Sequence, residues 1–383
     1  MRVLVSSTPG YGHVLPMVPL ARALLSAGHE LLWATGADAC QVVRAAGIGA
    51  AESGLTDTEV APLRAEARRA AAGIAPELVP TRVFPVLFGA ARAEPMLAGL
   101  LPVAREWQPD LVLHENGELA APLVATLLGV PHVVHAFGGA IPAAILADGS
   151  ESVADLWSRH RLEVPPYAGC YQHLYLDICP PALQTVSRDH IDVTQQLRPV
   201  IYTGESAELP AGLSRDDDRP LVYLTLGTVQ NLPDVLRTAV TALAGLDVRL
   251  LVTVGPAGDP SALGPQPPHV IVERYVSQAA VLPLCAAVVS HGGSGTVFGA
   301  AGLGLPQVCL PQGADQFRNT EGVVRSGAGL GLHPHQADGA AMAEAVRTVL
   351  DSPEIRAAAG RLSEEVATMP GPDQVVTRLA ELV

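Results

Sequence analysis

Lysine is absent from this sequence, because all 24 basic residues are arginine. A chain without lysine cannot form a lysine Schiff base and cannot supply the phosphate-binding lysine of a Walker motif. The absence of lysine therefore excludes pyridoxal enzymes, class I aldolases and P-loop NTPases. Aromatic residues are also scarce, at 4% of 383 residues, so we expect a core of aliphatic side chains.

Positive charge and paired cysteines are lacking as well. The formal net charge of −14 argues against a sequence-independent nucleic-acid binder, which needs a basic surface. The five cysteines show no CxxC spacing and are odd in number, which indicates neither a disulfide framework nor a zinc site. A reducing, cytoplasmic location fits this usage. The apolar run at residues 1–5 is too short for a signal peptide, and Pro131 and Pro142 interrupt the long apolar stretch 119–146, so we expect no membrane helix.

The first half of the chain alternates between strands and helices. Residues 2–7 and 30–35 have the character of buried strands, and the helical stretch 17–28 separates them, which predicts a parallel βαβ unit. The pattern returns at 110–115 and 132–137. Between the predicted strands 30–35 and 110–115 lies an insertion, 55–105. It has predicted helices at 58–73 and 81–105, which several prolines interrupt. Such an insertion often carries specificity.

The second half repeats the alternation after a polar stretch, 205–220, which is typical of an interdomain linker. Strands are predicted at 221–227, 249–255, 269–276, 286–290 and 306–311, and helices fill the last fifty residues. The predicted fold class is therefore α/β, with two doubly wound Rossmann-like domains, 1–204 and 221–383, and a last helix that packs back on the N-terminal domain. Open sheets of this kind bind ligands at the carboxyl ends of their strands, so we expect an active site in a central cleft that both domains face.

The first strand is followed by PGYGHVLP, residues 9–16, which lacks the third glycine of a dinucleotide fingerprint. His13 would lie at the carboxyl end of that strand and at the start of a helix, where a neutral imidazole can serve as general base. Glu115 ends the strand 110–115 at the same edge and could orient that base. The alternative is a helix-capping His13 and a solvated loop acid at Glu115.

The most informative motif is SHGGSGTVFGAAGLGLP, residues 290–306, which follows a predicted strand and opens a helix at about Ser294. Its glycines let backbone amides approach a ligand, and the helix N-terminus favours an anion. The motif predicts a diphosphate site without lysine, in which His291 donates a hydrogen bond. Alternatively, His291 is a turn or capping residue.

Other strand ends carry weaker signals. Asp315, Gln316 and Asn319 suit the recognition of hydroxyl groups, although Asp315 could equally cap a helix. Tyr275 could stack on a nucleobase or belong to the core. The run Asp216 to Asp218 formally matches a metal-binding pattern, but no histidine or strand end accompanies it, and we interpret it as linker charge.

Taken together, the chain resembles the GT-B fold glycosyltransferases that use nucleotide sugars, and within them the actinobacterial branch that acts on antibiotics and macrolides. The resemblance covers essentially the whole chain. It rests on residues 10–24, 109–117, 224–228 and 274–283, and above all on SHGGSGTVFGAAGLGLPQVCLPQGADQFRNT at 290–320. The chain departs from the family at two positions, with Glu115 where Asp is frequent and Tyr275 where Trp is frequent.

The resemblance implies a role for each matching position. His13 would deprotonate the acceptor and Glu115 would support it. The implied donor-binding residues are Thr225, Gly227, Thr228, Tyr275, Val276, His291, Gly293, Ser294, Gly295, Thr296, Asp315 and Gln316. The aromatic residues Phe84, Phe88, Trp157 and Tyr171 are the expected acceptor contacts.

The predicted activity is transfer of a deoxysugar, with inversion, from a dTDP-sugar or a UDP-sugar to a hydrophobic aglycone. No metal or other cofactor is expected. A nucleotide-sugar epimerase or hydrolase, and a non-catalytic partner of another transferase, are the alternatives. The expected partners are the nucleotide-sugar donor and the aglycone acceptor, without nucleic acid or membrane. The sequence leaves open the sugar, the acceptor atom and the oligomeric state, a homodimer included.

Overall fold

The computed structural model describes residues 1–202, 204, 209–210, 212–213, 218–227 and 233–383. Contacts divide the chain into two compact units. Unit 1 comprises residues 1–179, 186–204 and 369–383, and unit 2 comprises residues 180–185 and 205–368. The division differs from the predicted domains at residues 180–185, which belong to unit 2. The last helix belongs to unit 1, the unit on which it was expected to pack. Residues 205–208, 211 and 214–217 of the predicted linker, with Asp216 and Asp217, lie outside the described residues.

Unit 1 is built on a seven-stranded parallel sheet in the order β3-β2-β1-β4-β5-β6-β7. Its strands are β1 (Arg2–Ser6), β2 (Glu30–Thr35), β3 (Gly49–Glu52), β4 (Leu111–Glu115), β5 (His132–His135), β6 (Leu174–Asp177) and β7 (Thr194–Gln196). The order reverses between β1 and β4, so the carboxyl ends of these two strands form a switch point, where ligands bind in open α/β sheets. The sequence predicted four of the seven strands and missed β3, β6 and β7.

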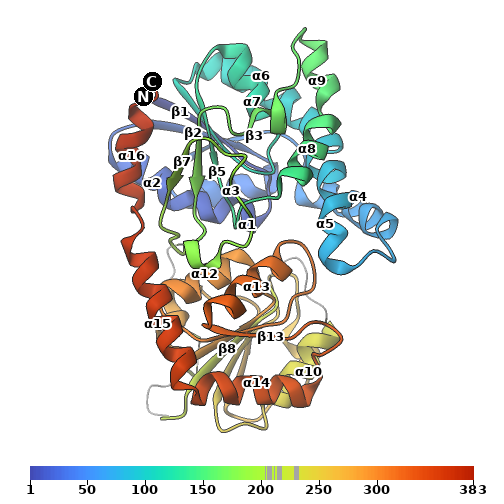
Figure 1. Ribbon diagram of the computed structural model, residues 1–383, viewed down its shortest axis with the longest axis vertical. Helices are drawn as coiled ribbons and strands as arrows, with labels where there is room; N and C mark the ends of the chain where they lie inside the picture. The colour runs from blue at the N-terminus through green and yellow to red at the C-terminus, as the bar shows by residue number, and fades with distance from the viewer. Residues whose placement is uncertain (203, 205–208, 211, 214–217, 228–232) are drawn as a thin grey trace. The chain divides into compact units, whose positions relative to one another are not determined.

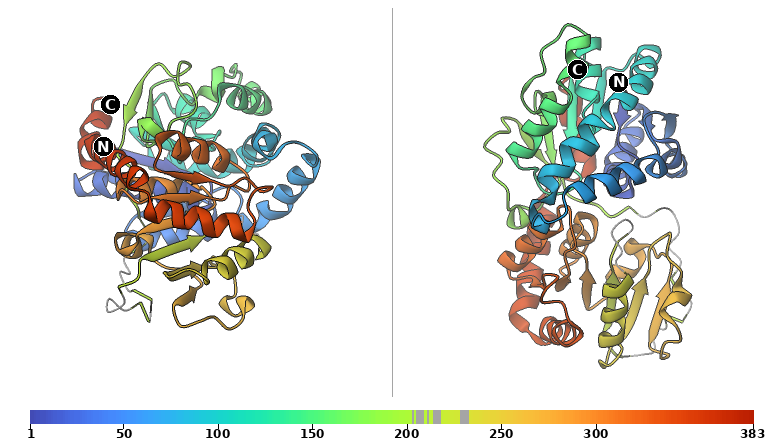
Figure 2. Two further views of the ribbon diagram at one scale, coloured as in Figure 1. Left: turned by 60° about the horizontal axis from the view of Figure 1, so that its bottom comes forward. Right: turned by 90° about the vertical axis from the view of Figure 1, so that its right-hand side faces the viewer.

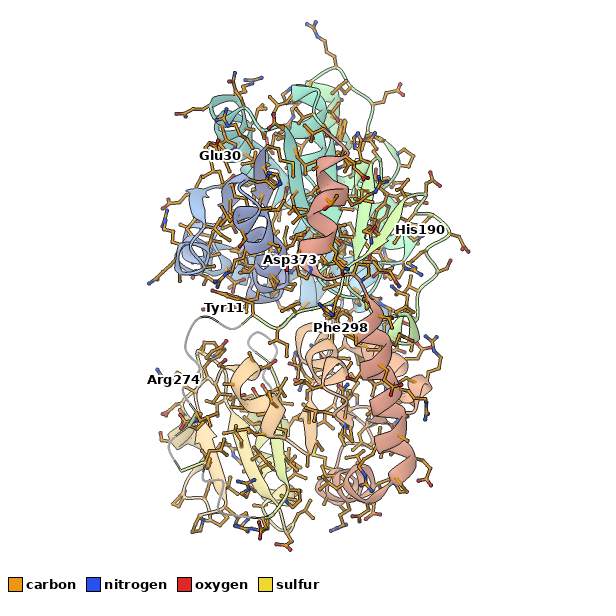
Figure 3. The ribbon with its side chains drawn as sticks, turned by 90° about the vertical axis from the view of Figure 1, so that its left-hand side faces the viewer. Tyr11, Glu30, His190, Arg274, Phe298 and Asp373 are labelled. Atoms are coloured by element: carbon orange, nitrogen blue, oxygen red, sulfur yellow. The ribbon has the colours of Figure 1, made fainter. Side chains whose placement is uncertain are left out.

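Helices cover both faces of this sheet (Figure 1). They are α1 (Tyr11–Val14), α2 (Val18–Ser26), α3 (Ala37–Ala45), α4 (Asp57–Ala70), α5 (Val79–Phe84), α6 (Ala93–Trp107), α7 (Ala121–Leu128), α8 (Ala143–Ser152), α9 (Ala154–Arg159) and α16 (Pro372–Ala380). Helices α6 and α7 pack with inward-facing residues such as Leu4 and Val112 in one apolar core. Helix α16 packs against α2, and Asp373 marks its first turn in Figure 3.

The predicted insertion forms α4, α5 and α6. Helix α4 begins with a capping box, because Thr56 Oγ1 accepts from the amide of Glu59 while the Glu59 carboxylate accepts from the amide of Thr56. The prolines do not end the second helical stretch. A π-helical turn, Pro85–Ala90, continues α5, and a hydrogen bond from the amide of Ala91 to the carbonyl of Val86 closes it.

One helical run, Pro76–Trp107, is long and apolar enough to cross a membrane by length and composition. Core helices of soluble proteins pass the same test, and this run packs against the sheet and against α7. The length and composition of this helical run are therefore not evidence that it crosses a membrane.

Unit 2 holds a six-stranded parallel sheet in the order β10-β9-β8-β11-β12-β13, seen from two further sides in Figure 2. Its strands are β8 (Leu221–Thr225), β9 (Arg249–Thr253), β10 (Val270–Glu273), β11 (Ala287–Ser290), β12 (Gln307–Cys309) and β13 (Gly329–Gly331). Its helices are α10 (Pro233–Leu243), α11 (Gln278–Val281), α12 (Ser294–Gly302), α13 (Gln316–Ser326), α14 (Gly339–Asp351) and α15 (Pro353–Thr368). Five of the six strands were predicted, and the switch point lies between β8 and β11.

Candidate active site

His13 and Glu115 meet at the switch point of unit 1. Glu115 is the last residue of β4, and His13 lies in α1, which follows β1 after a short loop. Nδ1 of His13 lies 3.1 Å from Oε1 of Glu115. This is ion-pair distance, although the ring nitrogen is not aligned for a regular hydrogen bond. The structure thus brings together the two residues that the sequence predicted as a base and its orienter.

The carboxylate of Glu115 is completely buried and fully engaged. Its Oε1 accepts from the amide of Thr8 at 3.2 Å and from the Thr8 hydroxyl at 2.9 Å, and its Oε2 accepts from the amide of Gly117. Burial alone would raise the pKa of Glu115, but His13 and these donors outweigh it and lower the pKa to about 2. Glu115 is therefore an ionised carboxylate at neutral pH, and the alternative of a solvated loop acid is wrong.

The imidazole of His13 is 18% exposed and lies among aromatic rings. Its centroid lies 4.5 Å from that of Phe137 and 5.5 Å from that of Phe88. Gly10, and not His13, occupies the N-cap position of α1, so the capping alternative for His13 is also wrong. Nε2 of His13 makes no hydrogen bond to any described residue, which leaves this nitrogen available to a ligand.

The four predicted acceptor contacts have different surroundings. Phe88 stacks on Phe84, with centroids 4.9 Å apart, and Phe88 also contacts His13. Trp157 is 1% exposed inside the apolar core, so its assignment to the acceptor site needs correction. Tyr171 packs against the rings of Tyr175 and His190. An aromatic residue in an insertion is equally suited to a core and to a pocket, and only the packing separates the two cases.

The predicted diphosphate motif of unit 2 has the expected local form. It runs from the end of β11 through a glycine loop into α12, and Phe298, labelled in Figure 3, is buried on that helix. Gly293 is the N-cap, and no side chain caps the helix. The first amides of α12 are thus left without the partners that a helix interior provides, which is the local basis of an anion site.

His291 lies in a space that two glycines leave open. A Cβ atom at Gly227 or at Gly293 would lie 2.5 Å from Nε2 of His291, so neither position can carry a side chain while the ring stays in place. Nδ1 of His291 is buried and has no hydrogen-bonding partner among the described residues. Burial lowers the pKa of His291 to about 4, against an opposing effect of Asp315, so the ring is neutral at neutral pH.

A polar network holds the glycine loop against α13. Nδ2 of Asn319 donates to the carbonyl of Gly292 at 2.8 Å, and it lies 3.0 Å from both Oγ of Ser294 and Oδ2 of Asp315. Ser294 also donates to Oδ2 of Asp315 at 2.6 Å. Asp315 occupies the N-cap position of α13, but its side chain makes no cap hydrogen bond. Asn319, which the sequence indicated as suited to hydroxyl recognition, donates its amide to the loop and holds it in place.

Gln316 and Asp315, both predicted to bind the donor, each have one polar side-chain atom that makes no hydrogen bond to a described residue. Oε1 of Gln316 accepts from the amides of Gln312 and Gly313, which leaves its Nε2 as a donor. Asp315 uses Oδ2 for Ser294 and Asn319, which leaves its Oδ1 as an acceptor.

The other predicted donor residues lie at neighbouring strand ends. Thr225 ends β8, and its hydroxyl accepts from the amide of Gly227 at 3.3 Å. Tyr275 follows Arg274, which Figure 3 labels, and is 46% exposed, while Val276 is buried. Gly295 and Thr296 lie in the first turn of α12, where Thr296 accepts from Gln278 at 3.1 Å. Thr228 lies outside the described residues.

Within the described part of the chain, no group of three or more His, Cys, Asp or Glu side chains could hold a metal ion. All five cysteines are buried, and none of them forms a disulfide. No motif indicated two residues near this site, namely Phe137, whose ring contacts His13, and Arg92, whose guanidinium lies over the Phe88 ring. Phe137 follows β5 without any motif, and Arg92 precedes α6 in a stretch that contains several other arginines.

Comparison with known proteins identifies the family over nearly the whole chain. Residues 22–227 match the N-terminal domain, and residues 237–382 the C-terminal domain, of the family described as erythromycin biosynthesis protein CIII-like. The chain is 35% identical to the L-demethylnoviosyl transferase of Streptomyces niveus, over 99% of this chain and 98% of that protein. It is 33% identical to the elloramycin glycosyltransferase ElmGT of Streptomyces olivaceus, over 99% of this chain and 97% of that protein.

Solved structures agree with this relationship. The spinosyn rhamnosyltransferase SpnG complexed with thymidine diphosphate superposes with a TM-score of 0.82 at 28% identity, over 99% of this chain and 100% of that one. The same enzyme complexed with the spinosyn aglycone gives the same TM-score and identity. The predicted GT-B fold class is thereby confirmed. The chain belongs to the erythromycin CIII-like family and is a glycosyltransferase.

Proposed function

We propose that this glycosyltransferase moves a deoxysugar from a dTDP-sugar to a hydrophobic natural-product acceptor, with inversion at the anomeric carbon and with His13 as the general base. The observation that carries the proposal is the orientation of His13. Its Nδ1 faces the ionised carboxylate of Glu115 at 3.1 Å, while its Nε2 makes no hydrogen bond to a described residue. This arrangement favours the tautomer with the proton on Nδ1, and Nε2 is then the basic atom.

In the proposed reaction, Nε2 of His13 takes the proton from the acceptor's nucleophilic group. The freed electron pair forms the new bond to the anomeric carbon, and the bond from that carbon to the diphosphate oxygen breaks. The imidazolium that forms is stabilised by the buried negative charge of Glu115. A positioned base of this kind is worth about 10²- to 10⁴-fold in rate.

The diphosphate leaves with its negative charge on the glycine loop of unit 2. In the proposal, the amides at the start of α12 and the neutral ring of His291 stabilise that charge. Oδ1 of Asp315 and Nε2 of Gln316 bind sugar hydroxyls, and Tyr275 and Val276 line the binding site of the nucleobase. The thymidine diphosphate in SpnG, and a 2-deoxy-L-fucose transferase and a TDP-daunosamine transferase among the relatives, support a deoxysugar carried on dTDP.

The donor half of the proposal is tested by calorimetric titration with dTDP and with UDP. We expect dTDP to bind, and the His291→Ala variant to bind it more weakly. His335→Ala is the matched control, because His335 is an exposed histidine of the same unit. Failure of both nucleotides to bind the wild-type protein would remove the donor assignment.

The catalytic half is tested by transfer from a dTDP-deoxysugar to a panel of phenolic and macrolide aglycones, with products measured by mass spectrometry. We expect His13→Ala to lower kcat by about 10²- to 10⁴-fold and to leave dTDP affinity unchanged. Near-normal turnover in this variant would show that another group takes the proton. Sugar release at the same rate without any acceptor would indicate a hydrolase instead.

A further inference from the structure

Arg92 lies beside the predicted acceptor site without a role in the reaction described above. It precedes α6 and is 7% exposed. Its guanidinium carbon lies 4.9 Å from the centroid of the Phe88 ring, and Phe88 in turn contacts His13. Gly117 permits this arrangement, because a Cβ atom there would lie 2.7 Å from the Phe88 ring.

The buried guanidinium has no polar partner in the described part of the chain. Its Nε is buried without a hydrogen bond, and no ion pair or hydrogen bond joins the guanidinium to the side chain or backbone of any described residue. Burial, reinforced by the nearby positive charge of Arg64, lowers the pKa of Arg92 to about 10, so the group is still a cation at neutral pH. A buried cation without a partner is unfavourable, and such groups are normally paired.

The charges that face Arg92 are already engaged with other groups. They belong to Arg64, Asp57, Asp38 and Glu115. Asp57 forms an ion pair with Arg64, and Asp38 accepts from the amides of Ala39 and Asp57. The Glu115 carboxylate accepts hydrogen bonds from Thr8 and Gly117 and faces His13. None of these three carboxylates is a direct partner of Arg92.

We propose that Arg92 binds an anionic oxygen of the acceptor, either a carboxylate or an ionised phenol or enol. The planar guanidinium presents several N–H donors in a fixed fork, which suits such oxygens, and the adjacent Phe84 and Phe88 rings suit a flat unsaturated skeleton. The acceptor is thus an acidic aromatic or enolic molecule, and Arg92 determines specificity for it. The inference rests on the proposed acceptor site of unit 1.

The test compares acidic and neutral forms of the same small acceptor. In one arm, binding of 6-hydroxy-2-naphthoic acid is measured against its methyl ester, and in the other a nitronaphthol that ionises near neutral pH is measured against unsubstituted naphthol. We expect the acidic form to bind about 10- to 100-fold more tightly in at least one arm, as for a hydrogen bond to a charged group. The arm that shows the preference distinguishes carboxylate from phenolate. Equal affinities in both arms, or no measurable binding of any probe, would overturn the proposal.

Variants of Arg92 test whether this residue causes the preference for the acidic probe. Arg92→Gln should abolish it, and Arg92→Lys should retain part of it, because the charge remains while the planar fork is lost. Arg69→Gln is the matched control, since Arg69 is an exposed arginine of the same insertion. A preference that survives in a folded Arg92→Gln protein would assign Arg92 only to packing on Phe88. The wild-type comparison does not depend on the folding of any variant.

These measurements need no donor, so they separate this inference from the proposed function. If the wild-type protein prefers the acidic probes but does not bind dTDP, the Arg92 site is supported and the transfer proposal is removed. Normal transfer to neutral acceptors, without any preference for the acidic form, would support the transfer proposal and overturn the role of Arg92.

Discussion

In the proposed reaction, catalysis at the carboxyl edge of the unit 1 sheet depends on charged side chains, whereas donor binding at the carboxyl edge of the unit 2 sheet depends on backbone amides and a neutral ring. Glu115 is buried as an anion, and its cost of burial is offset by Thr8, Gly117 and His13. His291 is half-buried and uncharged, between glycines that leave room for its ring. A proton acceptor needs a fixed charge beside it, but a diphosphate brings its own charge and needs only oriented donors. The two edges should therefore respond differently to substitution and to pH.

The largest difference is expected for Glu115→Gln. This variant removes the charge that supports the imidazolium, and it sets an amide N–H against the donors that now face the carboxylate. We expect kcat to fall by about 10²- to 10⁴-fold and the free energy of unfolding to fall by about 1–3 kcal/mol. Transfer kinetics and urea denaturation measure the two effects.

The affinity of the Glu115→Gln protein for dTDP should remain at the wild-type value, because the predicted donor residues all belong to unit 2. Glu106→Gln serves as the control, since Glu106 is exposed on α6. An undiminished kcat in Glu115→Gln would mean that the buried charge has no part in catalysis.

The complementary change in unit 2 is Gly295→Val. A Cβ atom at Gly295 meets no atom within 4 Å, so the side chain should fit the unliganded protein and extend where the diphosphate is expected. We expect dTDP binding to weaken on the order of 10²-fold through misplacement of the phosphates, with little change in thermal stability. Gly360→Val is the matched control, because Gly360 on α15 also has open space around its Cβ position. Normal dTDP affinity in Gly295→Val would place the phosphates elsewhere.

The smallest effect is the pH dependence that His291 contributes to the free energy of unfolding. His291 has a native pKa of about 4, while an unfolded histidine has one of about 6.5. Below pH 6.5 the unfolded chain binds a proton that the native ring does not, so the stability contributed by the neutral ring is complete above pH 6.5 and is lost as the pH falls toward 4. Glu115, with a native pKa of about 2, keeps its contribution until the pH falls below about 4.3.

At pH 5, therefore, unit 2 should already be weakened by His291 while Glu115 remains ionised. We expect the His291→Asn variant to reduce the pH dependence of the free energy of unfolding by at most about 1.4 kcal/mol per pH unit between pH 6.5 and 4. Urea denaturation at pH 7, 6 and 5 measures the slope, with His335→Asn as the control. A slope equal to that of the wild type would contradict the neutral state of His291.

Most of the strands could be predicted because their residues are strongly apolar and strand ends carry turn signals. Of the strands that escaped prediction, Thr194–Gln196 of β7 and Gly329–Gly331 of β13 are short and lack this pattern, whereas β6, Leu174–Asp177, is apolar and buried and was missed nonetheless. Strands β7 and β13 join their sheets through backbone hydrogen bonds to strands already in place, and such pairing leaves little trace in the side chains.

Two α/β sheets, the glycine loop with His291, and His13 with Glu115 at adjoining strand ends could all be predicted, because periodicity and spacing are local properties of the chain. Which polar groups are buried, and what each of them contacts, became known from the folded structure alone. Trp157 lies in the core, Asn319 holds the glycine loop against α13, and the Arg92 guanidinium lies on the Phe88 ring without a hydrogen bond or ion pair to any described residue. The physical reason is that burial and pairing depend on residues far apart in the chain, which no local pattern records.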